Sequence, residues 1–227
     1  MVVVPKKQEE YNNSVFNEVK NNKCKICRRE GMKLFLKGQR CLTPKCSMVK
    51  RPYPPGQKSK RRKGPPSEYG KELSEKQKLK FLYNLSERQF KNYVNKTLKR
   101  RGKTEDLADF LIQILELRLD NTVFRLGFAL SRPQARQLVS HNFFLVNEKP
   151  MNIPSYQVKK GDVISVKSQK LKKNTLKNIE NLIKKYKTPS WLELNVEKLE
   201  GKVVSKPTLE EVAPPVEIPV IFEFYSR

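Results

Sequence analysis

The stretch LRLDNTVFRLGFALSRPQARQLVSHNFFLVN, residues 117–147, decides the fold of this chain. Asp120 is suited to cap a short helix that Gly127 would close. Ser131 can cap a second short helix, which ends at Asn142, a residue that accepts a positive φ readily. Residues 143–146 and 163–166 have the composition of short strands, with turn residues between them. Two short helices and a small sheet are therefore expected here.

Basic side chains are spread through this segment. Arg132 and Arg136 are four positions apart and so project from one side of their helix. A rigid surface of this kind can bind an RNA backbone by shape, through phosphates and 2′-hydroxyls. The candidate RNA contacts of the segment are Arg118, Arg125, Arg132, Arg136, Gln137, His141 and Lys149.

The composition of the whole chain points to the same partner. Among 227 residues, Lys and Arg number 48 against 23 acidic residues, which gives a formal net charge of +25. Such a chain binds a polyanion by releasing condensed counterions, with a steep dependence on salt. No apolar run is long enough to span a bilayer and no lipidation motif is visible, so we expect nucleic acid and no membrane partner.

The four cysteines have the spacing of metal ligands, Cys24-x2-Cys27-x13-Cys41-x4-Cys46. No secretory signal precedes them, so a reducing compartment is expected, where metal binding is favoured over disulfides. Four thiolates make a closed structural site, and zinc is the first choice. An iron–sulfur cluster on the same cysteines is the alternative. Candidate RNA contacts beside them are Arg28, Arg29 and Arg40.

A basic segment rich in proline and glycine, residues 50–66, follows the cysteines and cannot form a regular helix. We expect it to become ordered against RNA phosphates. Its aromatic Tyr53, like Tyr69 and Trp191, could stack on a base or simply pack. Its candidate contacts are Lys50, Arg51, Tyr53, Lys58, Arg61, Arg62 and Lys63.

Helices are predicted on both sides of the central segment. One begins near Leu73; a second starts at a capping box formed by Ser86 and Gln89 and ends at Gly102; a third starts after Thr104. Residues 176–186 predict a further amphipathic helix. Residues 203–204 and 221–225 are expected to be short strands or irregular.

The motifs of the chain resemble the S-four family of ribosomal proteins in its metal-binding form. The N-terminal body of that family is similar to residues 24–34, 36–41, 51–57, 67–70, 75–78 and 86–90. Its RNA-binding module and C-terminus are similar to residues 119–121, 125–129, 131–132, 134–139, 152–156 and 222–227. By this resemblance Tyr69, Lys76 and Lys78 join the candidate RNA contacts.

The resemblance implies an α+β fold that is mainly α: a helical body with an N-terminal four-cysteine metal knuckle and an inserted α/β module of two short helices on a small sheet. The expected parts are a flexible N-terminal extension (residues 1–15), the body with the knuckle and basic linker (16–106), the RNA-binding module (107–172), and a C-terminal helix and tail returning to the body (173–227).

The resemblance also implies a function without catalysis. The protein would be a cytoplasmic constituent of the small ribosomal subunit. It would be a primary binder of the 16S rRNA 5′ domain at a multi-helix junction, where it would nucleate 30S assembly. Expected partners are ribosomal protein S-five, other small-subunit proteins and mRNA near the entry channel, with an influence on translational accuracy.

Four residues depart from the family pattern. Asn84, Asn142 and Glu148 stand where glycine is usual, and Leu209 stands where arginine is common. Asparagine keeps the left-handed backbone accessible, whereas Glu148 could alter its turn.

Two other classes of function compete with the ribosomal interpretation. An RNA-modifying enzyme that carries this module would need a catalytic domain with a positioned acid or base, for which the chain has no room. A free translational regulator or a zinc-containing DNA binder fits the chain length. Near-stoichiometric presence in salt-washed small subunits separates the ribosomal interpretation from both.

Overall fold

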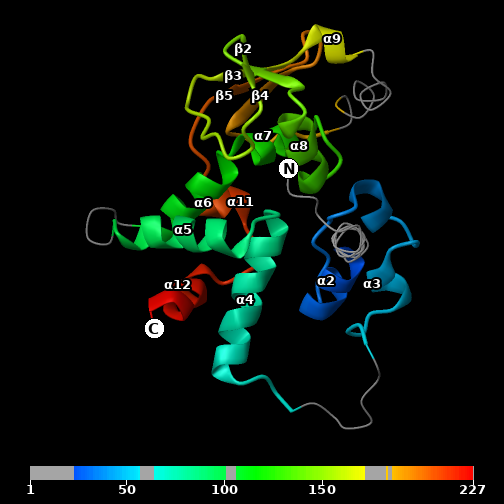
Figure 1. Ribbon diagram of the computed structural model, residues 1–227, viewed down its shortest axis with the longest axis vertical. Coiled ribbons are helices and arrows are strands. Elements are labelled where there is room, and N and C mark those ends of the chain that lie inside the picture. The colour runs from blue at the N-terminus through cyan, green and yellow to red at the C-terminus, as the bar shows by residue number, and fades with distance from the viewer. Residues whose placement is uncertain (1–22, 57–63, 101–105, 172–182, 184–185, 227) are drawn as a thin grey trace, which may run out of the picture. The chain divides into compact units, whose positions relative to one another are not determined.

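The structure is a computed structural model that describes residues 23–56, 64–100, 106–171, 183 and 186–226 (Figure 1). The predicted extension, residues 1–15, and Gly102 lie outside this part of the chain, as does nearly all of the helix predicted at 176–186. The chain divides into two compact units, Met1–Pro65 and Pro66–Arg227.

Three short helices form the described part of the first unit: α2 (Lys23–Glu30), the 3-10 helix η1 (Gly38–Cys41) and α3 (Ser47–Lys50). Its buried apolar side chains are few, namely Cys27, Leu34, Leu36, Cys41 and Cys46. A core of this size supplies little free energy of folding, and three of its members are cysteines.

The second unit begins with α4 (Glu68–Leu82), which starts five residues before the predicted Leu73. The Ser67 side chain caps it by accepting a hydrogen bond from the Gly70 N–H at 3.2 Å. Helices α5 (Glu87–Leu98) and α6 (Leu107–Glu116) follow as predicted. Ser86 caps α5 by accepting from the Gln89 N–H at 3.3 Å, but Oε1 of Gln89 is buried without a partner among the described residues, so only half of the capping box forms.

Helices α7 (Leu119–Arg125) and α8 (Arg132–Ser140) are the two short helices expected in the central segment. The prediction that Asp120 caps α7 was wrong, because Arg118 is the N-cap and Asp120 lies in the first turn. Ser131 does precede α8, though its side chain makes no capping bond. Gly127 (φ 82°) and Asn142 (φ 59°) adopt the left-handed backbone conformation that ends each helix.

A five-stranded antiparallel sheet has the order β2-β1-β3-β5-β4. Its strands are β1 (Phe144–Val146), β2 (Lys149–Met151), β3 (Val163–Val166), β4 (Leu192–Asn195) and β5 (Glu200–Val203). Strand β2 lies in a segment predicted to be a turn, and β4 was not predicted. The two-residue turn between β1 and β2, Asn147 and Glu148, has a positive φ at both positions, as the right-handed twist of a hairpin requires.

Helices α7 and α8 pack on the sheet, as Figure 1 shows. Leu119 and Val123 of α7 and Leu138 of α8 share one hydrophobic core with strand residues such as Phe144 and Val203. Trp191 is 1% exposed within this core, so it packs and cannot stack on a base. Two strands of the sheet come from the C-terminal segment, residues 173–227.

Helix α9 (Ser168–Leu171) follows β3, and α11 (Leu209–Val212) and α12 (Ile218–Ser226) follow β4 and β5. Thr208 and Glu211 form a reciprocal capping box at α11. The prediction of strand or irregular structure at residues 221–225 was wrong. Ile218 and Ile221 of α12 are buried, and the helix lies against α4 and α5 (Figure 1), so tertiary packing overrides the β-propensity of this apolar run.

Carboxylate, ammonium and aromatic groups join α12 to α4 and α5. Glu87 accepts hydrogen bonds from Lys76 (2.7 Å), Lys80 (2.8 Å) and the Tyr225 hydroxyl (2.9 Å). The Lys76 ammonium also lies 4.4 Å from the centroid of the Phe224 ring. Partial burial alone would raise the pKa of Glu87, but these donors lower it to about 2.

This arrangement predicts a stability loss in acid. The pKa of Glu87 is about 2 in the folded chain against an ordinary value of 4.5. Its ionised form therefore stabilises the fold above the ordinary pKa, and this contribution is lost as the pH falls from 4.5 toward 2. In Glu87→Gln, the free energy of unfolding from urea titrations should be lower near neutral pH and depend less on pH in this window. The matched control is Glu193→Gln, an exposed residue, and an equal pH dependence in both variants would contradict the prediction.

Candidate nucleic-acid interface

The four cysteines come together in the first unit. Cys24 and Cys27 lie on α2, Cys41 ends η1, and Cys46 immediately precedes α3. All four are free thiols and line one hollow, together with residues such as Leu36. Its interior is about 20 Å³, room for a single occupant the size of a water molecule.

The sulfur atoms are close enough to influence one another. Burial raises the pKa of Cys27, and the negative charges that Cys41, Cys24 and Cys46 would carry as thiolates raise it further. Within the described part of the chain, however, no group of three or more His, Cys, Asp or Glu side chains is arranged as it would be around a metal ion. The cysteines thus share one site, but their arrangement is not that of a bound metal.

The basic residues beside the cysteines differ in accessibility. Arg29 and Arg40 are exposed, as are Lys50 and Arg51 at the end of α3. Arg28 is half-buried: its Nε donates to the carbonyl of Tyr53 at 2.8 Å, and its guanidinium lies 4.9 Å from the centroid of the Tyr53 ring. Lys58, Arg61, Arg62 and Lys63 lie outside the described residues.

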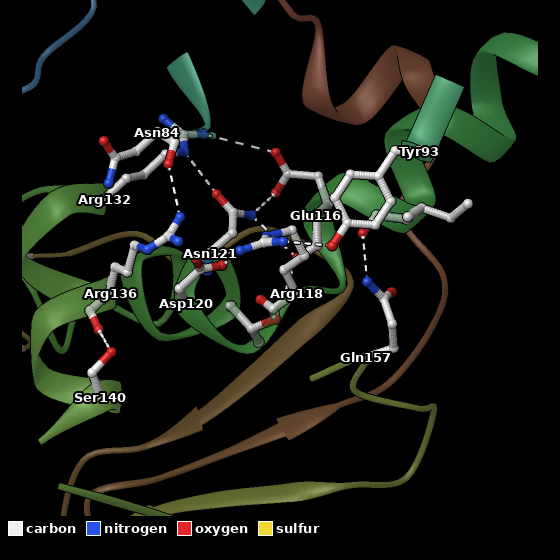
Figure 2. Close-up of polar contacts among 12 residues, drawn as sticks. Asn84, Tyr93, Glu116, Arg118, Asp120, Asn121, Arg132, Arg136, Ser140 and Gln157 are labelled. Atoms are coloured by element: carbon white, nitrogen blue, oxygen red, sulfur yellow. Dashed lines mark hydrogen bonds and ion pairs between the residues drawn. The ribbon is translucent and has the colours of Figure 1, made fainter. Parts of the chain in front are cut away.

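In the second unit, the carboxylate of Glu116 at the end of α6 is the centre of a buried network (Figure 2). It accepts hydrogen bonds from the Tyr83 hydroxyl at 2.6 Å and from the Asn121 side-chain amide at 2.7 Å. Nε and Nη2 of Arg125 also donate to it, at 2.9 and 2.8 Å. Nη2 of Arg132 lies 3.8 Å away. Complete burial would raise the pKa of Glu116, but Arg125 and Arg132 outweigh it and lower the pKa.

Arg118 forms a second buried ion pair next to this network. It is fully buried, and Nε and Nη2 donate to the two carboxylate oxygens of Asp120 at 3.0 and 2.7 Å. Its Nη1 donates to the hydroxyl of Tyr93 on α5. Burial alone would lower the pKa of Arg118, but Asp120 and Tyr93 raise it, so the buried guanidinium stays charged.

Arginines of the module therefore reach the helical body as well as their own helices. Arg132 lies over the rings of Tyr83 (4.9 Å) and Phe124 (4.7 Å), and Nη1 of Arg136 donates to the carbonyl of Asn84 at 2.9 Å, as Figure 2 shows for Arg136 and Asn84. Tyr83 and Asn84 follow the last residue of α4, far from α8 in sequence. In this structure Arg132 and Arg136, two of the predicted RNA contacts, connect the module to the body.

Several of the predicted RNA-contact residues are buried or paired within the chain. Arg118 is 0% exposed and Lys76 is 6% exposed, so a direct RNA contact by either would require this structure to open. Arg125 and Arg132 are largely covered, and Lys78 pairs with Glu75 at 2.6 Å. The candidates that stay exposed in the second unit are Tyr69, Gln137, His141 and Lys149.

The positions that depart from the family pattern have clear structural roles. Asn84 and Glu148 keep the left-handed conformation, with φ of 54° and 65°. Glu148 thus preserves the turn backbone without glycine. At Leu209 the backbone N–H, rather than a side chain, donates to Oδ1 of Asp109 at 2.7 Å.

Comparison with known proteins places these two units in one family. The profile described as ribosomal protein S4/S9 N-terminal domain matches residues 18–116, and the S4 domain profile matches residues 117–164. The protein named small ribosomal subunit protein uS4 of Halothermothrix orenii is 50% identical over 204 residues, which are 90% of this chain and 96% of that protein. The proteins of the same name from Thermodesulfovibrio yellowstonii and Thermus thermophilus are 48% and 46% identical over the same shares.

The chain belongs to the uS4 family. The N-terminal domain profile ends at residue 116 and the S4 domain profile begins at residue 117. Glu116, in the first matched segment, therefore pairs with Arg125 and Arg132 in the second. In this uS4-family chain, no helix of the described part is long and apolar enough to cross a membrane.

Sequence reasoning missed the role of Glu116 and of its partners Tyr83 and Asn121. One signal was present: Glu116 follows the mainly apolar residues 110–115, and Arg118, Arg125 and Arg132 come after it at seven-residue intervals. A buried carboxylate needs charge partners, and such arginines are the residue type that supplies them.

Removing this carboxylate should destabilise the module strongly. Glu116→Ala leaves Arg125 and Arg132 near one another in a covered site without their shared counter-ion, and the expected loss is about 3–5 kcal/mol of unfolding free energy. Urea unfolding followed by circular dichroism measures it. Glu197→Ala, the same substitution at an exposed residue, should change stability by less than about 0.5 kcal/mol. A loss of similar size in both variants would contradict the central role of Glu116.

Proposed function

We propose that this chain is a structural constituent of the small ribosomal subunit that binds 16S rRNA and catalyses no reaction. The observation that carries the proposal is membership of the uS4 family along 90% of the chain. The net charge of +25 supports it, because a surface of this kind gains its binding energy from phosphate neutralisation.

The buried ion pairs fit this function. Glu116, Asp120 and their arginines make a rigid connection between helices, while the exposed cations are left available to phosphates. A scaffold that is preorganised loses less conformational entropy when it binds a folded RNA. The exposed Gln137 and His141 of α8 and Lys149 of the β1–β2 hairpin are the module's proposed contacts.

Finer features of the proposal rest on the resemblance. They are binding at the multi-helix junction of the 5′ domain, nucleation of 30S assembly, contacts with ribosomal protein S-five, and a position near the mRNA entry channel that influences accuracy. The division into extension, body, module and returning tail at residues 15, 106 and 172 belongs to the same proposal.

Binding to rRNA can be tested with exposed cations whose side chains make no hydrogen bond or ion pair with any residue of the described part of the chain. We expect Lys50→Glu with Arg51→Glu to weaken binding to a 16S 5′ domain transcript at least about tenfold and to reduce the slope of log K against log salt by about one to two. Filter binding at several salt concentrations measures both quantities.

The control for charge alone is Lys198→Glu with Lys202→Glu, two exposed residues next to or on β5 that are not predicted contacts. It makes the same change in net charge and should have the smaller effect on affinity. Equal effects of the two pairs would show that residues 50 and 51 act only through long-range charge. A wild-type chain that does not bind the transcript would overturn the proposed function.

The shared cysteine site is proposed to hold one zinc ion, with Cys24, Cys27, Cys41 and Cys46 as ligands. Three features support this: four free thiols line one hollow, the hollow has room for one small occupant, and the unit has a very small apolar core. Thiolate coordination would supply the free energy of folding that this core cannot, once the sulfur atoms close around the ion.

Metal analysis tests the site. Protein purified without oxygen should contain about one zinc per chain by mass spectrometry, and Cys41→Ser should lose most of it. Ser47→Ala, a change beside Cys46 that removes no thiol, should retain the metal. Iron with acid-labile sulfide would identify the alternative cluster, and neither metal near stoichiometric amounts would refute a four-cysteine site.

A further inference from the structure

Cys24 and Cys27 place two free thiols one helical turn apart on α2. Cys24 is the second described residue of this helix and is half-buried, whereas Cys27 is buried. In an α-helix the Cα atoms of residues i and i+3 are about 5 Å apart, which is inside the range that a disulfide spans. An oxidant that arrives from solvent therefore meets Cys24 first, and a second thiol is within reach of it.

A disulfide between these two residues would be strained. On a regular helix the Cβ atoms at i and i+3 are about 5–6 Å apart, whereas an unstrained disulfide holds them at about 4 Å. The turn of α2 from Cys24 to Cys27 must loosen before the two sulfur atoms can join. Strained disulfides are the more easily reduced ones, so this disulfide would form under oxidising conditions and be reversed by cellular thiols.

Helix α2 is joined to the segment that carries the proposed RNA contacts Lys50 and Arg51. Arg28 follows Cys27 directly, and its Nε donates to the carbonyl of Tyr53 at 2.8 Å. In addition, α2 packs against α3, whose last residue is Lys50. Loosening of α2 therefore disturbs the segment that presents these two cations.

The described part of the first unit has little else to hold its shape. Three of its few buried apolar side chains, Cys27, Cys41 and Cys46, are thiols of the shared hollow. A core of this size cannot compensate for displacement of the Cys27 sulfur. The disulfide would also consume two of the four thiols of the proposed metal site, so the disulfide and a bound ion exclude each other.

We propose that Cys24 and Cys27 form a reversible oxidation site through which peroxide lowers the affinity of the free chain for rRNA. The effect on affinity rests on the proposed function. It would make assembly of this chain into the subunit sensitive to oxidative conditions.

The chemistry has two steps and uses one hydrogen peroxide. The Cys24 sulfur attacks a peroxide oxygen and the O–O bond breaks, so that a sulfenic acid forms and the thiol proton leaves with the departing hydroxide as water. The Cys27 sulfur then attacks the Cys24 sulfur, the S–O bond breaks, and the Cys27 proton leaves with hydroxide as a second water. The two sulfur atoms together supply the two electrons that reduce the peroxide.

Oxidation of the full chain in vitro tests the proposal. Reduced chain purified without oxygen is treated with hydrogen peroxide, its remaining thiols are alkylated, and its disulfides are mapped by mass spectrometry. A Cys24–Cys27 disulfide is expected, with a loss of affinity for the 16S 5′ domain transcript of about tenfold, because Lys50 and Arg51 are no longer held in place. Dithiothreitol with added zinc should restore the affinity to within about twofold.

The matched control is Met48→Leu, which removes an oxidisable methionine that lines the same hollow. This variant should form the disulfide and lose affinity as the wild-type chain does. Loss of the peroxide effect in Met48→Leu, absence of the Cys24–Cys27 disulfide, or a disulfide without a change in affinity would overturn the proposal. A reduced wild-type chain that does not bind the transcript would overturn the proposed function instead, while the disulfide map still tests the oxidation site.

Discussion

The charge of one buried carboxylate constrains much of the second unit. Glu116 can stay ionised in the interior only while Arg125 and Arg132 face it and while Tyr83 and Asn121 donate to it. These partners come from the end of α4, from α7 and from α8, so the requirement of one acidic group fixes the position of three helices relative to α6. Arg118 with Asp120 and Tyr93 adds a second constraint of the same kind.

The buried pairs reduce the electrostatic cost of folding for a chain with a large excess of cations. Arginines that are neutralised internally do not contribute to repulsion at the surface, and those that remain exposed are held on a defined framework. The acidic residues are used selectively: Glu116 and Asp120 neutralise arginines in the interior, and Glu87 joins α12 to α4 and α5.

Local signals predicted the helices and strands with strong periodicity or capping, including α5, α6, α8 and β3, and the left-handed residues Gly127 and Asn142. The wrong predictions lie where contacts between residues distant in sequence determine the local structure. Residues 221–225 are rich in strand-forming types yet are helical against α4. Likewise, the four-residue spacing of Arg132 and Arg136 placed both on one face of α8 but could not show that this face meets Tyr83 and Asn84.

The burial of Trp191 has a practical consequence. It is the only tryptophan of the chain, and it lies in the core shared by α7, α8 and the sheet. Its indole emission is therefore an optical reporter on the integrity of that one core, with no contribution from a second indole elsewhere. Loosening of the module can thus be followed by intrinsic fluorescence while far-ultraviolet circular dichroism records the helices of the entire chain.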